Sequence, residues 1–147
     1  MIDAGSSADN YVEVYDEPDH ERCLVNDFVF VYRVRLKPGC TTLWHRHQQD
    51  TVYFSLGNAR AGEQFPVAES VVTDIPCGAA VSRPHRLEPL IHKVSNRGDE
   101  AFHLIGAEAL QRPPDTHTST LELDHHEQVF ESDRVRVYRI NMAPRTA

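Results

Sequence analysis

The chain has 147 residues, 40% of them hydrophobic, which suits one domain with a single buried core and no disulfide framework. Its formal net charge of −7 argues against nucleic acid or an anionic membrane surface as the main partner. No apolar run approaches the ~20 residues that span a bilayer, and no signal peptide precedes the acidic start. Cys23, Cys40 and Cys77 are odd in number and form no CxxC pair, which favours free thiols. We therefore expect a cytoplasmic globular protein that binds neither nucleic acid nor membrane.

The predicted elements are strands almost throughout. Residues 1–10 are small and polar, and we expect a flexible N-terminus there. Short runs rich in Val, Tyr, Phe and Thr, separated by turn residues, predict strands over 28–36, 41–47, 51–56, 70–73, 79–82, 91–94, 101–107 and 134–142. Because no convincing amphipathic helix interrupts these runs, they indicate an all-β antiparallel sandwich or barrel. We assign 11–112 to the barrel and 113–147 to a C-terminal extension.

The most informative residues are two histidines in the predicted strand 41–47. His45 and His47 are two positions apart, and alternate residues of a strand point to the same face, so both imidazoles can reach one point. A third imidazole from a later strand, His92, would complete three ligands for a divalent first-row metal. Positions on the metal would remain for substrate or water. The sequence therefore predicts a metal site built from His45, His47 and His92.

Strand periodicity also predicts which neighbours share the interior with the histidines. If His45 and His47 point inward, Thr41 and Leu43 do so as well. In the next predicted strand, Thr51, Tyr53 and Ser55 point to the same side as the two histidines. This part of the interior is therefore polar and resembles a pocket wall. The Tyr53 hydroxyl is a candidate hydrogen-bond donor or acid, although a solvent-facing tyrosine fits the pattern equally well.

The residues on the opposite face of the predicted strand 51–56 form an apolar strip. It consists of Val52, Phe54 and Leu56. Such a strip must be covered by a second sheet or by another subunit.

An internal repeat is the second strong feature of the sequence. Residues 20–38 align without a gap on residues 126–144, at an offset of 106, with His, Glu, Asp, Val, Val, Tyr, Arg and Pro recurring in register. The second copy stops where the first runs on to the histidine pair, so no metal site is expected in it. Two interpretations remain open. The appended strand either pairs with the edge of its own or a partner's sheet, or the chain is a shortened two-barrel protein.

Two sequence motifs resemble those of the cupin superfamily. The first is Gly39-x5-His45-x-His47, followed by a strand and a Gly57-Asn58 turn, and the second combines Pro76-Cys-Gly78 with His92-x3-Asn96. The resemblance covers roughly residues 20–110. It implies a double-stranded β-helix jelly-roll barrel with a metal near one mouth. It also implies that His45, His47 and His92 are the ligands. Because barrels of this family commonly pair through such an apolar sheet face, it further implies a homodimer.

The chain departs from the family pattern in two places. The usual cupin glutamate, four residues after the second histidine, is replaced by Thr51, while Asp50 could bind only if the hairpin shifted register. The interval from Gly78 to His92 is too long for the family motif, so residues 79–91 are either an insertion or a degenerate motif. His85 lies in this interval and is a rival ligand or a substrate-binding group.

Three histidines without the carboxylate resemble the iron centres of cupin thiol dioxygenases and diketone-cleaving dioxygenases. Neutral ligands leave the 2+ charge of the metal uncompensated, which favours a small anionic substrate bound to it. We therefore predict a dioxygenase with Fe²⁺ favoured over Zn²⁺, Ni²⁺ or Mn²⁺, in which Tyr53 or His85 assists proton transfer. The alternatives are an isomerase or lyase, which Asp50 or Glu88 as a fourth ligand would favour, and a non-enzymatic module that binds a small molecule.

Overall fold

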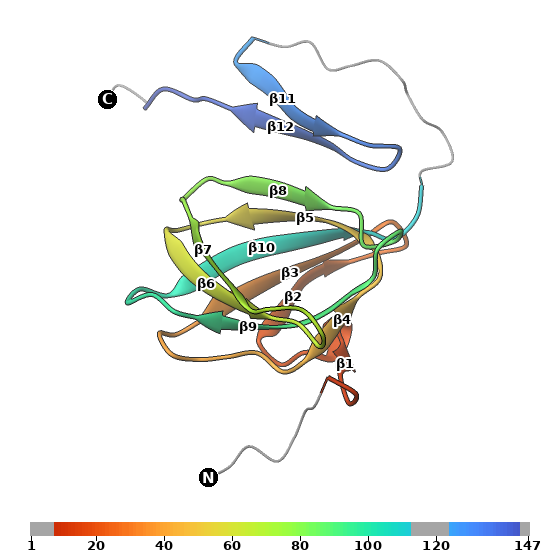
Figure 1. The fold of residues 1–147 in the computed structure, drawn as a ribbon. Helices are drawn as coiled ribbons and strands as arrows, with labels where there is room; N and C mark the ends of the chain where they lie inside the picture. Colours follow the sequence, from red (N-terminus) through yellow and green to blue (C-terminus); the bar gives the residue numbers. More distant parts are fainter. Residues whose placement is uncertain (1–7, 113–123, 145–147) are drawn as a thin grey trace. The chain divides into compact units, whose positions relative to one another are not determined.

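The computed structural model describes residues 8–112 and 124–144 (Figure 1). Two compact units divide the chain, one ending at Leu110 and the other beginning at Gln111. Of the expected flexible N-terminus 1–10, residues 1–7 lie outside the described residues. Within the described ranges no helix is long and apolar enough to cross a membrane. The three cysteines are free thiols, as predicted, and all three are exposed.

The first unit consists of ten strands and one short 3₁₀ turn. Its elements in chain order are β1 (Val12–Glu13), η1 (Val14–Asp16), β2 (His20–Val25), β3 (Val29–Leu36), β4 (His45–His47), β5 (Asp50–Ser55), β6 (Ala59–Gln64), β7 (Val71–Ile75), β8 (Ala80–Arg83), β9 (Leu90–Asn96) and β10 (Phe102–Ala109). They form two five-stranded sheets, in the orders β1-β4-β9-β6-β7 and β2-β3-β10-β5-β8. All ladders are antiparallel except the one between β1 and β4. The predicted all-β jelly-roll barrel is confirmed.

Strand β3 provides most of the core because it alternates strictly between the two faces of its sheet. Its inward residues Phe30, Tyr32, Val34 and Leu36 are buried, as the period of two requires for a half-buried strand. The neighbouring strand β10 runs antiparallel to it from Val29↔Ala109 to Leu36↔Phe102. Gly106 of β10 lies against the Tyr32 ring, and a Cβ there would approach the ring Cζ to 2.2 Å. The tyrosine therefore requires a glycine opposite it.

The strand predicted over 41–47 is shorter than expected, and this changes which neighbours face inward. Only residues 45–47 are extended in a ladder, and Thr41 forms an isolated bridge with Ser95 after a turn in which Gly39 has φ +77°. Because the chain bends between Thr41 and His45, the strict alternation fails there. Thr42, rather than Thr41 or Leu43, is buried and lines the interior.

Of the two alternatives left open for residues 79–91, an insertion throughout is excluded, because the strand predicted over 79–82 forms there. Residues 80–83 form β8, which pairs with β5 as a regular strand of the second sheet. The Pro76-Cys-Gly78 segment is the turn between β7 and β8, where Gly78 has φ +80° and the Ala79 amide donates to the Pro76 carbonyl. Of the second motif, therefore, only His92-x3-Asn96 lies beside the histidine pair, on β9.

The second unit is a hairpin rather than the single strand predicted for the C-terminal repeat. Strand β11 (His126–Glu131) pairs antiparallel with β12 (Arg136–Ile140) in a two-stranded sheet. The aligned first copy, residues 20–38, contains β2 and β3, which pair with each other in the same way. The repeat is thus a repeat of one hairpin.

Candidate metal centre

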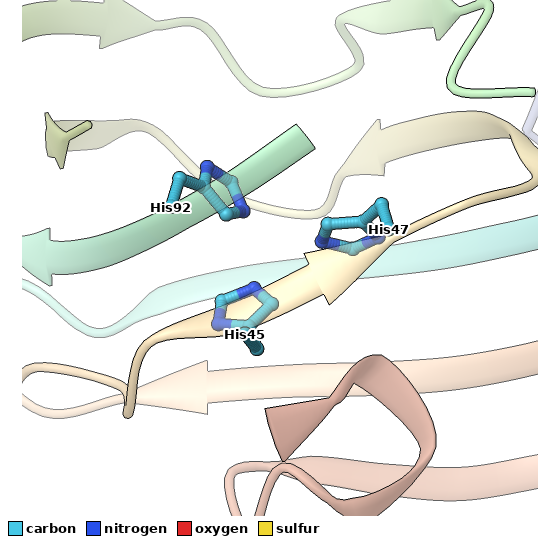
Figure 2. A group of neighbouring side chains, drawn as sticks. All are labelled: His45, His47 and His92. Carbon is cyan, nitrogen blue, oxygen red and sulfur yellow. The ribbon is translucent and has the colours of Figure 1, made fainter. Parts of the chain in front are cut away.

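The three predicted histidines meet inside the first unit. Strand β4 presents His45 and His47, and the antiparallel neighbour β9 places His92 directly opposite His45. One nitrogen from each ring lies within 4.8 Å of one from each other ring (Figure 2). All three side chains are buried. The residues that the sequence selected as ligands therefore converge on one point, and Asp50, Thr51 and Glu88 are outside this cluster.

Each of the three imidazoles is held by a hydrogen bond at Nδ1. His45 Nδ1 lies 2.9 Å from the Leu43 carbonyl, His47 Nδ1 lies 3.1 Å from Glu108 Oε1, and His92 Nδ1 lies 3.2 Å from Glu63 Oε2. When Nδ1–H donates to these oxygens, Nε2 is left as the nitrogen with a lone pair. His92 Nε2 is buried and has no hydrogen-bond partner. A metal ion would satisfy it, and the oriented rings are typical of metal-ligating histidines.

Burial keeps the histidine pair in the form that binds metals. It lowers the pKa of His45 to about 2 and that of His47 well below its ordinary value, and the nearby His92 adds to both shifts. Imidazoles with such pKa values are neutral at pH 7, and only a neutral imidazole has a lone pair to donate. The site is therefore ready to take up a cation without first releasing protons from these two rings.

Two carboxylates behind the histidines were not found by sequence reasoning. Glu108 of β10 is fully buried, accepts a hydrogen bond from Tyr15 Oη at 3.0 Å, and has its pKa raised to about 7 by burial. Glu63 of β6 has its pKa lowered, chiefly by the hydrogen bond from His92. The sequence does contain a clue to Glu108. It lies an even number of residues after the apolar Phe102, and residues at even spacing in a strand point to the same face, so both point inward from β10.

The two predicted proton-transfer residues lie beside His47. Tyr53 Oη is 3.1 Å from His85 Nε2 and 3.4 Å from His47 Nδ1. The ring centroids of His85 and His47 are 5.2 Å apart in a stacked arrangement. His85 is therefore a neighbour of the cluster and not one of its three members. Of the two readings of Tyr53, the structure supports the inward one.

A sixth aromatic group near the cluster, His20 of β2, was also missed as a site residue. Its ring stacks on Tyr32 with centroids 4.6 Å apart and meets His45 edge-on at 4.8 Å. Glu17 Oε2 lies 4.0 Å from its Nε2, yet burial dominates and lowers the His20 pKa to about 4. A neutral ring here packs against the cluster without adding positive charge to it.

The histidines line a cavity of about 210 Å³ inside the barrel. Its charged lining groups are Glu63 and Arg83, among the described residues. Most of the remaining wall is apolar: Val34, Ala61, Ile75, Ala79, Val81, Leu90, Val94, Phe102 and Leu104. The cavity therefore suits a small molecule with an apolar body and a polar end at the histidines.

Comparison with solved structures identifies the fold class. A cupin domain from Bordetella pertussis is 29% identical over 61% of this chain and 90% of that chain, with a TM-score of 0.56. An RmlC-like cupin with a double-stranded β-helix fold from Methanocaldococcus jannaschii is 12% identical over 74% of this chain and 84% of that one, with a TM-score of 0.51. The polyketide cyclase RemF from Streptomyces resistomycificus is 17% identical over 83% and 89% of the two chains, also at 0.51. No protein-family model and no curated protein matches the chain.

The architecture of the first unit is thus a cupin double-stranded β-helix, with a cluster of histidines inside the barrel. In fold, this unit is similar to the cupin domains of solved structures.

Proposed function

We propose that the chain is a metal-dependent cupin enzyme, a dioxygenase of the three-histidine Fe²⁺ type that acts on a small molecule. The observation that carries the proposal is the set of three buried imidazoles, each held at Nδ1, with the Nε2 of His92 left without a partner. His45, His47 and His92 would hold the ion. A bound Fe²⁺ would supply Lewis acidity and redox chemistry at the polar end of the cavity.

The substrate class follows from the charges and the shape of the cavity. Three neutral ligands leave the metal cationic, which favours an anionic group on the substrate, although the Glu63 carboxylate behind His92 offsets part of that charge. Arg83 is on the cavity wall and can pair with an anion. The apolar remainder of the wall favours a hydrocarbon body, so we propose a small, largely apolar acid, thiol or diketone.

Tyr53 and His85 form the proton-handling pair of the proposed site. Burial raises the pKa of the Tyr53 phenol and lowers the pKa of His85 to about 4, so that at pH 7 the first is protonated and the second is neutral. The Tyr53 O–H is then the donor and His85 Nε2 the acceptor of their 3.1 Å hydrogen bond. Tyr53 can then donate its proton to a substrate and regain one from water, while His85 Nε2, which carries no proton, orients the hydroxyl as its acceptor.

The first experiment measures the metal content of the isolated protein by elemental analysis, beside His47→Ala and a matched His126→Ala variant. We expect about one iron per chain in the wild type and in His126→Ala, and none in His47→Ala. Zinc or nickel in the same ratio would contradict the iron assignment and favour Lewis-acid chemistry. Absence of metal from the wild type, even after reconstitution, would overturn the enzyme proposal.

The second experiment measures oxygen uptake by the iron-loaded protein with thiol, diketone and aromatic carboxylate probes. We expect uptake that depends on one of these probes and falls at least tenfold in Tyr53→Phe, because the proton donor is lost. Equal turnover of a probe without oxygen would contradict the dioxygenase and favour the isomerase or lyase alternative.

A further inference from the structure

The position of one proton on each imidazole decides whether the three histidines can bind a metal. A neutral imidazole carries its proton on Nδ1 or on Nε2, and only the nitrogen without the proton can bind an ion. His45 Nδ1 lies 2.9 Å from the Leu43 carbonyl, and His92 Nδ1 lies 3.2 Å from the Glu63 carboxylate. Because both oxygens can only accept, both rings carry the proton on Nδ1 and leave Nε2 for the ion.

His47 differs from the other two histidines because two groups of opposite character meet its Nδ1. Glu108 Oε1 lies 3.1 Å away, and a carboxylate oxygen can only accept, which requires the proton on Nδ1. Tyr53 Oη lies 3.4 Å away and can donate, which would place the proton on Nε2 instead. The second arrangement blocks the nitrogen that an ion needs. The group that bonds Nδ1 therefore decides whether His47 can be a ligand.

The distances favour Glu108 over Tyr53 as the partner of His47. The contact with Glu108 is the shorter of the two, and Tyr53 Oη has a nearer acceptor in His85 Nε2, at 3.1 Å. A hydroxyl has a single proton, so a Tyr53 that donates to His85 does not donate to His47. Glu108 is 0% exposed, so water does not compete for its oxygens. His47 therefore carries its proton on Nδ1 in this structure.

Tyr15 fixes the Glu108 carboxylate from its other side. Its Oη donates to Glu108 Oε2 at 3.0 Å, while Oε1 accepts from His47. Burial and the neighbouring Glu108 raise the pKa of Tyr15, so its hydroxyl keeps the proton and remains a donor. The carboxylate thus accepts at both oxygens and cannot turn without losing a bond. By contrast, the Glu63 side chain is 35% exposed, so water can replace it as the partner of His92.

We propose that Glu108, held by Tyr15, is a positioning residue that selects the metal-binding tautomer of His47. The inference rests on the proposed function, because His47 is taken as a metal ligand. Without the carboxylate, the Tyr53 hydroxyl can turn from His85 to His47 Nδ1, and the proton of the His47 ring then lies on Nε2. The cluster would offer two ligand nitrogens instead of three, and its affinity for an ion would fall.

The first measurement determines the tautomer of His47 in the metal-free protein at neutral pH, by long-range proton–nitrogen NMR of the imidazole rings. We expect the proton on Nδ1 in the wild type and on Nε2 in Glu108→Leu, which has a similar shape but no acceptor. Glu108→Gln should keep the Nδ1 proton, because its amide oxygen can still accept from His47 while its NH₂ group donates to Tyr15 Oη. The matched control Glu63→Leu removes a carboxylate from His92 and should leave His47 unchanged.

The second measurement is the dissociation constant for Zn²⁺, a redox-inert probe of the site, by competition with a chromophoric chelator. We expect Glu108→Leu to raise it about 100-fold and Glu108→Gln about tenfold, because the amide keeps the tautomer but not the charge. Removing the rival donor as well, in Glu108→Leu/Tyr53→Phe, should make binding about tenfold tighter than in Glu108→Leu alone. A carboxylate that only supported the fold would give no such recovery.

Two results would overturn the proposal. One is a wild-type protein with the His47 proton on Nε2, which can be observed even if Glu108→Leu does not fold. The other is a Glu108→Leu variant that unfolds cooperatively and either keeps the proton on Nδ1 or binds Zn²⁺ as tightly as the wild type. Because the tautomer is measured without metal, a wild type that binds no Zn²⁺ would contradict the proposed function, and the NMR result would still decide the role of Glu108.

Discussion

The two hairpins of this chain have the same local structure and different surroundings. Both have the same register, bulge and turn hydrogen bonds. In the first, Tyr32 is fully buried between the glycine of β10 and the ring of His20. In the second, the equivalent Tyr138 is only half-buried. Local sequence therefore determines how a hairpin pairs with itself, and the neighbouring strand determines what the hairpin contributes to the core.

The largest difference between the two hairpins is expected when the two equivalent tyrosines, Tyr32 and Tyr138, are each truncated to alanine. We expect Tyr32→Ala to lower the free energy of unfolding by about 3–5 kcal/mol, because a large buried ring is lost and a cavity remains. Tyr138→Ala should cost about 1 kcal/mol or less, because its ring is less buried. Urea unfolding of both variants checks this. Equal losses would show that the second hairpin is as deeply packed as the first.

The equivalent histidines give a pH test. The pKa of His20 is lowered in the folded protein to about 4 from an ordinary value of 6.5, because burial disfavours the charged ring. Its contribution to stability is therefore present above pH 6.5 and is lost as the pH falls from 6.5 toward 4, by about 3 kcal/mol at most.

The measurement is urea unfolding of the metal-free chain at several pH values between 7.5 and 4.5. His20→Gln should flatten the loss of stability on acidification, and His126→Gln is measured beside it as the variant at the equivalent position. A His20→Gln slope equal to that of the wild type would show that the ring becomes protonated in the fold as readily as in the unfolded chain.

Substitution of Gly106, which lies opposite Tyr32, tests how much the packing of the first hairpin on β10 contributes to stability. In Gly106→Ala the added Cβ would lie 2.2 Å from Tyr32 Cζ, so either the ring or the backbone must move. We expect a loss of about 1–3 kcal/mol in the free energy of unfolding. Gly57→Ala is the control, because a Cβ there meets nothing within 4 Å. A Gly106→Ala variant as stable as that control would contradict the tight packing of the ring.

The smallest expected effect comes from the turns. Asn26→Ala removes two hydrogen bonds to backbone amides, and we expect a loss of about 1 kcal/mol. Ser132→Ala removes the equivalent bonds, which are longer, from a unit outside the barrel, and should cost less. Thermal unfolding followed by circular dichroism compares them. A larger loss in Ser132→Ala would reverse the expected order of the hairpins.

Part of the candidate site could be predicted from sequence because strand geometry is periodic. His45 and His47 share a face at a spacing of two, and Tyr53 has the parity that directs it inward. The same rule failed for Thr41 and Leu43 because the chain turns before β4 begins. The rule places Glu108 on the inward face of β10, but it cannot say that Glu108 or Glu63 contacts a histidine, since each reaches its histidine from a strand distant in sequence.

The sequence by itself determined the all-β class, the shared face of His45 and His47 and the repeat, because these depend on patterns within a strand or between matching segments, whereas the approach of His92 required the pairing of β4 with β9. Only the tertiary structure decided that the strand predicted over 79–82 pairs with β5 and that the repeat is a hairpin, since both are questions of strand pairing. It also decided the hydrogen bonds behind the imidazoles and the apolar cavity. Pairing brings together residues far apart in the chain, and no local pattern specifies which strands will meet.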